Sequence, residues 1–126
     1  MTEYRVVRGD RWWAFSLGFG RIQKARWISF NALPEKVKRA QVANPDLGAE
    51  EAVKMLTPEE NVAYGNEVVL ATLRLVLDGA SDWNRGTTTA DAYIDKVLPE
   101  DVAIEIYDVV QKVVVSTELD PESKKN

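Results

Sequence analysis

The chain has 126 residues, of which 45% are apolar and 29% charged, and its formal net charge at pH 7 is −4. A chain of this length and composition is expected to fold as one globular domain with its own hydrophobic core. Because the sequence contains neither cysteine nor histidine, it excludes disulfides, cysteine-based zinc and iron–sulfur sites, and acid–base catalysis by histidine.

Positive and negative charges are concentrated in different parts of the chain. Residues 1–40 contain nine Lys or Arg and three Asp or Glu, whereas residues 41–126 contain seven and seventeen. We interpret this asymmetry as two oppositely charged surfaces that assist docking or self-association. The alternative is a nucleic-acid-binding face on the N-terminal part, which the acidic charge of the whole chain disfavours.

The N-terminal part, residues 1–33, is predicted to be rich in β-structure. Tyr4–Val7 and Arg11–Leu17 are rich in β-branched and aromatic residues, and Gly9–Asp10 between them predicts a hairpin turn. Ala25–Leu33 alternates polar and apolar residues, which predicts a third strand after a basic hairpin loop. The aromatic residues here are interpreted as the core of a thin sheet. The alternative is a base-stacking platform made of Trp12, Trp13, Trp27, Arg21, Lys24 and Arg26.

Residues 34–118 are predicted to be helical, and the long helix Thr57–Gly79 is their central element. A short helix begins at Pro34 and ends before Pro45, and Ala49–Leu56 forms another. Thr57 and Glu60 have the spacing of a capping box, and Gly79 is expected to end the long helix. A brief helix over 90–97 follows, with Thr88 or Thr89 as its cap.

The last predicted helix begins at Pro99 and carries an apolar face rich in β-branched residues. Such a helix needs a surface to pack against. Packing on the long helix 57–79 within one chain is one interpretation, and contact with a partner or another subunit is the other. The residues of this face are Val102, Ile106, Val109, Val110 and Val113. Residues 119–126 are polar and predict a flexible tail.

These elements predict an α+β fold. We expect a single, mainly helical domain over residues 1–118, with an N-terminal antiparallel β-hairpin or three-stranded sheet and a disordered C-terminal tail over 119–126. No segment approaches the roughly 20 apolar residues that span a bilayer, and the N-terminus lacks the apolar core of a signal peptide. We therefore expect no membrane partner and a cytoplasmic location.

Carboxylates are the remaining candidates for chemistry. Asp78 with Asp82, and Asp91 with Asp95, could hold magnesium or transfer protons. No phosphate-binding glycine loop or calcium-loop spacing accompanies them, and Gly18-Phe19-Gly20 matches no nucleotide fingerprint. We therefore expect no catalytic site, no metal and no cofactor, and we expect that the protein is not an enzyme.

Three features carry a resemblance to a known family. A basic segment and a Pro-led helix over 25–43 precede the long capped helix, which ends in Leu77-Asp78-Gly79 followed by Asp82-Trp83-Asn84. Val97-Leu98-Pro99-Glu100 then introduces the last amphipathic helix. The chain finishes with an acidic and then Lys-Asn-rich segment, Glu118–Asn126. From residue 25 onward, this layout resembles the small tail assembly chaperones of long-tailed bacteriophages.

The resemblance implies a non-enzymatic protein of the host cytoplasm that binds the tape-measure protein and keeps it soluble during tail assembly. The tail-tube protein and a second copy of the chain are further partners to consider. A longer form made by ribosomal frameshifting is also typical of the family, and Lys124-Lys125-Asn126 is compatible with a slippery site. The partner-binding residues implied are the apolar face at 102–113 together with Trp12, Trp13, Arg21 and Lys24.

Two other functions are alternatives to the chaperone function. One is a structural part of the virion, such as a head–tail connector or a tail accessory protein. The other is a small nucleic-acid-binding module that uses the aromatic and basic residues of the N-terminal part.

Overall fold

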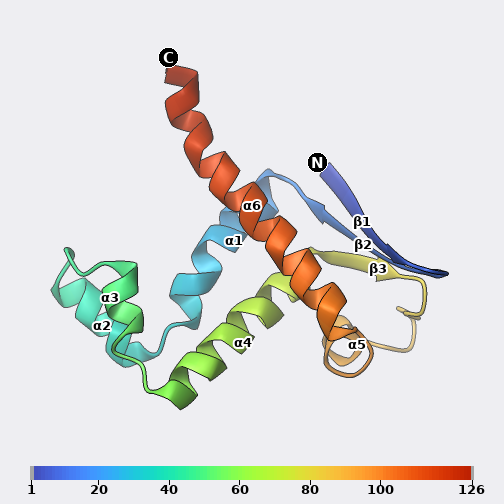
Figure 1. Ribbon diagram of the computed structural model, residues 1–126, viewed down its shortest axis with the longest axis horizontal. Coiled ribbons are helices and arrows are strands. Elements are labelled where there is room, and N and C mark those ends of the chain that lie inside the picture. The colour runs from blue at the N-terminus through green and yellow to red at the C-terminus, as the bar shows by residue number, and fades with distance from the viewer. Residues whose placement is uncertain (1, 126) are drawn as a thin grey trace.

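The computed structural model describes the backbone of residues 2–125 and the side chains of residues 2–48 and 50–116. Within that part of the chain, a three-stranded antiparallel sheet and six helices form the expected α+β fold (Figure 1). The elements are β1 (Thr2–Arg8), β2 (Arg11–Leu17), α1 (Phe19–Ala32), α2 (Glu35–Ala43), α3 (Ala49–Val53), α4 (Pro58–Val76), β3 (Leu77–Ala80), α5 (Ala90–Lys96) and α6 (Glu100–Lys125). The predicted flexible tail, 119–126, lies outside the range of described side chains.

The N-terminal hairpin forms as predicted. β1 and β2 pair in register from Thr2 opposite Leu17 to Arg8 opposite Arg11. Gly9 in the turn has a φ of 62°, a left-handed conformation that glycine adopts without steric cost. The alternation along β2 places Trp13, Phe15 and Leu17 on the inner face of the sheet, where all three are buried.

The third strand was predicted in the wrong place. Residues 25–33 do not form a strand, and residues 18–24 do not form a hairpin loop, because both segments belong largely to α1. Ile22, Ala25 and Ile28 recur every three residues, so a helix places them on one face, and that face packs in the core. The third strand is β3 (Leu77–Ala80), which pairs with β2 and includes Leu77–Gly79, the predicted end of the long helix.

The main core lies between the inner face of the sheet and the helices. α6 crosses the molecule diagonally (Figure 1) and buries Val102, Ile106 and Val110 against the other elements, all at 0% exposure. Leu73 and Val76 of α4 belong to the same cluster. Of the two interpretations of the α6 apolar face, packing within one chain is therefore the one the fold adopts.

A hydrogen-bonded chain fixes α5 and the 81–89 loop to the sheet. The Trp13 indole donates to the Tyr93 hydroxyl at 2.8 Å, and that hydroxyl donates to Asp82 Oδ1 at 2.5 Å. Arg11 completes the chain with a 2.7 Å hydrogen bond to Asp82 Oδ2. Trp83 stacks on the Tyr93 ring, with 5.2 Å between the ring centroids. Of the two residues predicted to cap α5, Thr88 and Thr89, Thr89 is the one that does so.

A second, smaller core holds the α2–α3 lobe, which lies at the opposite end of the molecule from the sheet (Figure 1). Its buried residues are Leu33, Val37 and Ala52, and Tyr64 of α4 packs against them. The predicted capping box begins α4: Thr57 accepts from the Glu60 amide, and the Glu60 side chain accepts from the Thr57 amide. A few buried residues therefore join α4 to the α2–α3 lobe.

The position of Ile106 in the core predicts a large loss of stability on truncation. Ile106→Ala is expected to lower the free energy of unfolding by about 2–5 kcal/mol, because it leaves a cavity among buried neighbours. Ile104→Ala on the same helix is the matched control, since Ile104 is 45% exposed, and its effect should be about 0.5 kcal/mol or less. Chemical denaturation measures both. Equal losses for the two variants would contradict this packing of α6.

The buried Tyr93 hydroxyl predicts a specific dependence of stability on alkaline pH. Burial, with the hydrogen bond to Asp82, raises the pKa of Tyr93 from 10.0 to about 12. The unfolded chain therefore loses this proton first, so the contribution of Tyr93 is complete below pH 10 and is lost as the pH rises towards 12. Denaturation at a series of pH values should show a shallower alkaline decline for Tyr93→Phe than for the wild type. Parallel declines of the two proteins would contradict the prediction.

Candidate partner-binding surface

The apolar face of α6 is largely enclosed by the rest of the fold. Val102, Ile106 and Val110 are completely buried, and Val109 and Val113 are partly buried against the same core. The expectation that Val102, Ile106 and Val110 bind a partner is wrong, because a side chain at 0% exposure cannot contact another molecule while this fold is intact. For the partly buried Val109 and Val113, partner binding stays a prediction.

The four N-terminal candidates also have separate positions. Trp13 is buried and donates its indole hydrogen to Tyr93. Trp12 is half-buried on the outer face of the sheet, where the Arg5 guanidinium lies 4.6 Å from its ring centroid. Arg21 makes a 3.0 Å ion pair with Asp78 and donates to the carbonyls of Ser16 and Val76. Lys24 is exposed. Burial of Trp13 and pairing of Arg21 also remove two members of the proposed base-stacking platform.

The structure instead exposes a set of aromatic side chains on α1. Phe19, Trp27 and Phe30 are exposed by 78%, 60% and 38%, respectively. With about 100° between successive residues, Phe19 and Phe30 lie roughly 20° apart around the helix axis, and Trp27 lies within roughly 80° of Phe19. The Trp27 and Phe30 rings pack edge to face, with 6.1 Å between their centroids. We call these three residues the α1 aromatic face.

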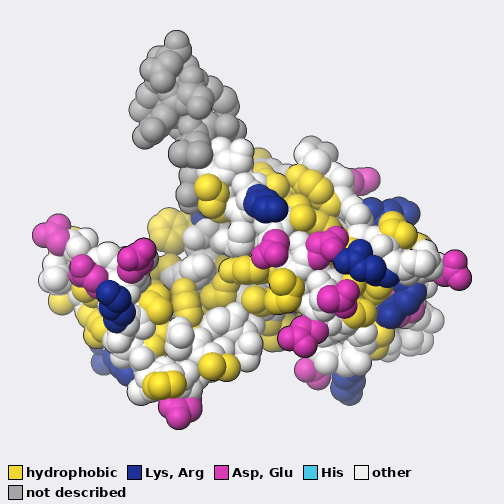
Figure 2. Space-filling view, in the orientation of Figure 1, with side chains coloured by type: hydrophobic (Ala, Val, Ile, Leu, Met, Phe, Trp, Pro, Cys, Tyr) yellow, Lys and Arg dark blue, Asp and Glu magenta, His cyan; other side chains and the backbone are white. Residues whose placement is uncertain are grey.

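α1 is therefore apolar on two opposite sides. Its inner side enters the core, and its outer side, the α1 aromatic face, extends for about 16 Å at 1.5 Å per residue. An ordinary surface helix has one apolar stripe and a polar remainder. Exposed apolar patches on a folded protein mark interaction sites, and on this face Gln23 and Arg26 lie between Phe19 and the Trp27–Phe30 pair. Figure 2 shows apolar side chains reaching the surface between the α2–α3 lobe and α6.

A pocket adjoins the α1 aromatic face at Phe30. It has a volume of about 220 Å³ and lies among α1, α2, α3 and α4. Its lining residues are Arg26, Ser29, Phe30, Leu33, Gln41, Ala52, Val53 and Tyr64. We call it the lobe pocket. An apolar wall with a few polar groups is typical of sites that take a specific side chain or small ligand.

Two residues of the lobe pocket carry unpaired polar atoms. Arg26 Nε and Gln41 Oε1 are buried and have no hydrogen-bond partner in the described part of the chain. Buried polar atoms in folded proteins are nearly always hydrogen-bonded. A group that accepts from Arg26 and donates to Gln41, such as a carboxamide or a peptide unit, would satisfy both.

The surroundings of the α1 aromatic face are positively charged. α1 contains Arg21, Lys24 and Arg26 and no acidic residue. Lys38 of α2 lies with its Nζ 5.9 Å from the Phe30 ring centroid. Among the described residues, Lys24 and Arg26 take part in no ion pair. This charge favours a partner segment that combines apolar and acidic side chains.

The candidate carboxylates act mainly as anchors. Asp78 accepts from Ser16 Oγ at 2.5 Å and pairs with Arg21, and Asp91 pairs with Arg74 at 2.8 Å. Burial opposes ionisation of Asp82, but the hydrogen bonds from Tyr93 and Arg11 outweigh it and lower the pKa of that carboxyl. In the described residues, no group of three or more Asp or Glu could hold a metal ion.

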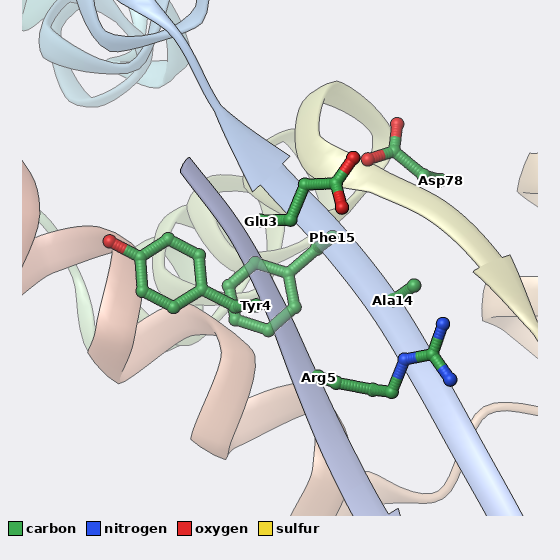
Figure 3. Close-up of a pocket in the computed structure, with 6 residues that line it drawn as sticks. All are labelled: Glu3, Tyr4, Arg5, Ala14, Phe15 and Asp78. Carbon is green, nitrogen blue, oxygen red and sulfur yellow. The ribbon is translucent and has the colours of Figure 1, made fainter. Parts of the chain in front are cut away.

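A second pocket lies on the outer face of the sheet (Figure 3), with a volume of about 350 Å³. Glu3 and Asp78 direct their carboxylates across β2 towards each other, and Arg5 lies along the same face. Tyr4 points to the opposite side of β1, and its ring stacks on Phe15 with 5.1 Å between centroids.

Among the helices in the described part of the chain, none combines the length and the apolar character that a membrane span requires.

The sequence pattern contained a signal for the α1 aromatic face that the strand prediction obscured. Phe19, Trp27 and Phe30 are separated by eight and three residues, which places them on one side of a helix. Recognising residues 19–32 as a helix with two apolar sides would have identified the surface. Gln41 and Tyr64 could not have been found this way, because only the tertiary fold brings them to Arg26.

Because the α1 aromatic face is exposed, we expect its residues to affect the binding of an apolar dye and not the stability of the fold. Trp27→Ser and Phe19→Ser should each change the free energy of unfolding by about 0.5 kcal/mol or less. Both should reduce the fluorescence of anilinonaphthalene sulfonate bound to the folded protein, because this dye is apolar and anionic. Val42→Ser is the control, since Val42 is 76% exposed on α2 outside this face. Equal dye binding by all four proteins would contradict the prediction.

The comparisons with known proteins do not extend this description. The chain matches no protein-family model, no curated protein and no solved structure. A functional conclusion therefore depends on the chemistry of the α1 aromatic face and the lobe pocket, together with the sequence resemblance.

Proposed function

We propose that this protein is a tail assembly chaperone of a long-tailed bacteriophage, which binds the tape-measure protein and keeps it soluble until the tail is assembled. The observation that carries the proposal is the α1 aromatic face, with Phe19 and Trp27 exposed by 78% and 60%. A tape-measure chain is long and helical, and its apolar stripes aggregate until the tail tube encloses them. A chaperone for such a chain needs an apolar surface of its own.

The geometry favours docking of an amphipathic helix along α1. The rise of about 16 Å from Phe19 to Phe30 corresponds to roughly three turns of a partner helix. In such contacts, apolar side chains at helical spacing enter an apolar groove and provide most of the affinity. Aromatic residues and arginine are also the residue types that contribute most strongly to binding. Phe19, Trp27 and Arg26 supply both types on one side of α1.

The lobe pocket adds selectivity to this contact. A carboxamide side chain of the partner helix that enters beside Phe30 would accept from Arg26 Nε and donate to Gln41 Oε1, the two buried atoms without partners. A site with buried polar groups rejects guests that leave those groups unpaired. The surrounding positive charge recruits acidic segments. Both features favour particular stretches of the tape-measure chain over others.

The proposed activity places the protein in the host cytoplasm during assembly. The tail-tube protein is a second proposed partner, because tube assembly must displace the chaperone from the tape-measure chain. A contact limited to one face of one helix is small, and small interfaces are typical of transient complexes. The assembling tube can therefore displace the chaperone without a further release step.

Co-expression with the tape-measure protein from the same genome tests the proposal. The wild-type chain should move the tape-measure protein into the soluble fraction and co-purify with it. Trp27→Ser should weaken binding by about tenfold or more, because it removes a central aromatic contact. Val42→Ser should retain binding. A tape-measure protein that remains insoluble beside the folded wild-type chain would overturn the proposal.

Composition of finished virions separates this function from its structural rival. A chaperone is released, so virions should lack the protein, whereas a connector or tail accessory protein would be retained in fixed proportion. Mass spectrometry of purified virions makes the distinction. Retention in stoichiometric amount would replace the chaperone function with a structural one.

A further inference from the structure

The two edges of the sheet differ in how well their backbone groups are protected. β3 is short, its pairing with β2 contains a register shift, and arginine side chains cover nearby carbonyls. Arg85 donates to the Asp78 carbonyl at 2.8 Å, and Arg21 donates to the Val76 carbonyl at 3.2 Å. β1 is seven residues long, contains no proline and pairs with β2 without a register shift. It forms the opposite margin of the sheet (Figure 1).

The pairing pattern shows which groups of β1 face this open edge. Trp12 directs its backbone towards β3, since its carbonyl accepts from the Ser81 amide and its amide donates to Ser81 Oγ. Backbone direction alternates along a strand, so Trp13 and Phe15 direct theirs towards Val6 and Tyr4, the residues opposite them on β1. The residues of β1 that direct N–H and C=O groups to the open edge are therefore Glu3, Arg5 and Val7.

Side chains at the open edge are charged and self-complementary. Glu3 and Arg5 are both exposed, and both project from the outer face of the sheet (Figure 3). Arg5 stacks on Trp12 within its own chain. Among the described residues, neither Glu3 nor Arg5 forms an ion pair. Glu3 and Arg5 are at positions i and i+2 on one face of the strand. When two copies of this strand pair antiparallel, the negative charge of each copy can therefore lie opposite the positive charge of the other.

We propose that β1 pairs antiparallel with β1 of a second copy of this chain, about a two-fold axis at Tyr4. Glu3 of each copy then lies opposite Arg5 of the other. The result is a continuous sheet of six strands across two chains, closed by symmetry. Its hydrogen bonds come from the outward backbone groups of Glu3 and Arg5.

Other registers are less favourable. A shift of two residues in the pairing places Arg5 opposite Arg5, or Glu3 opposite Glu3, and like charges directly opposite each other destabilise a strand pair. A shift of one residue would place the inner faces of the two sheets on opposite sides. The carbonyl of Val7 already accepts from the Arg8 side chain at 3.0 Å, so the Tyr4-centred register uses the edge groups that remain open.

The dimer is expected to be weak, because the paired segment is short and small interfaces are transient. This self-association is independent of the α1 aromatic face. Sedimentation equilibrium over a wide concentration range measures it on the full chain. Wild-type protein should show a reversible monomer–dimer equilibrium, whereas Glu3→Arg and Arg5→Glu should each weaken it by about tenfold or more.

The combined variant Glu3→Arg/Arg5→Glu should restore dimerisation to near the wild-type level, because the exchanged charges are again opposite. Lys54→Glu and Glu59→Arg are matched controls, since both residues are exposed and lie outside the sheet. They should leave the dimer unchanged. A monomer at all concentrations, or equal dimerisation by both single variants and the wild type, would overturn the proposal.

A cysteine cross-link tests the register directly, because the chain contains no cysteine of its own. Tyr4→Cys places the new thiols opposite each other at the axis, so mild oxidation should yield a disulfide-linked dimer. Val7→Cys on the same strand lies away from the axis and should cross-link poorly. Circular dichroism shows whether each variant is folded. Folded Tyr4→Cys protein that does not cross-link faster than Val7→Cys would exclude this register.

Discussion

The fold is stabilised mainly by the packing of α6 across the sheet and the other helices. Val102, Ile106 and Val110 are completely buried, and they join Trp13 and Phe15 of β2 in one cluster. A helix rich in β-branched residues has a low intrinsic helix propensity, so tertiary contacts must stabilise it. The sheet, in turn, is only three strands wide and needs this helix to cover its inner face.

Burial of the apolar stripe of α6 (Val102, Ile106 and Val110) restricts where the proposed partner can bind. Once this stripe is enclosed, apolar contact with another molecule has to use side chains outside the core. α1 supplies them because its inner side is fixed by the core and its first turn is held by the Arg21–Asp78 ion pair at 3.0 Å. Its outer side is therefore presented on a supported element. A rigid support lowers the conformational entropy that is lost on binding.

Local signals predicted the elements whose chemistry is contained in a few neighbouring residues. The Gly9 turn and the Thr57–Glu60 capping box are formed as expected, and Thr89 is the one of the two candidate residues that caps α5. α1 and β3 were missed for a physical reason. Ala25–Leu33 alternates like a strand and also repeats like a helix, and packing against α4 and α6 selects the helix. Leu77–Ala80 becomes a strand because β2 offers it an edge, which no local pattern reveals.

The candidate surface was predicted in part. The resemblance led us to expect an apolar partner-binding face. The sequence pattern of α6 allowed two interpretations, and packing in the core was one of them. Trp27 and Arg26 were singled out, but for stacking on bases. The lobe pocket could not be predicted, since Arg26, Gln41 and Tyr64 come from three helices and meet only in the folded chain.

Amide hydrogen exchange, measured on the free protein and again with the tape-measure protein proposed as its partner, would locate the binding surface. If the proposed partner contacts the outer side of α1, the enclosed residues of α6 stay in place. We expect slower exchange on binding at residues 19–32 and in the α2–α3 lobe, with little change at 100–116. Slower exchange confined to 100–116, or faster exchange there as α6 separates from the core, would contradict this expectation.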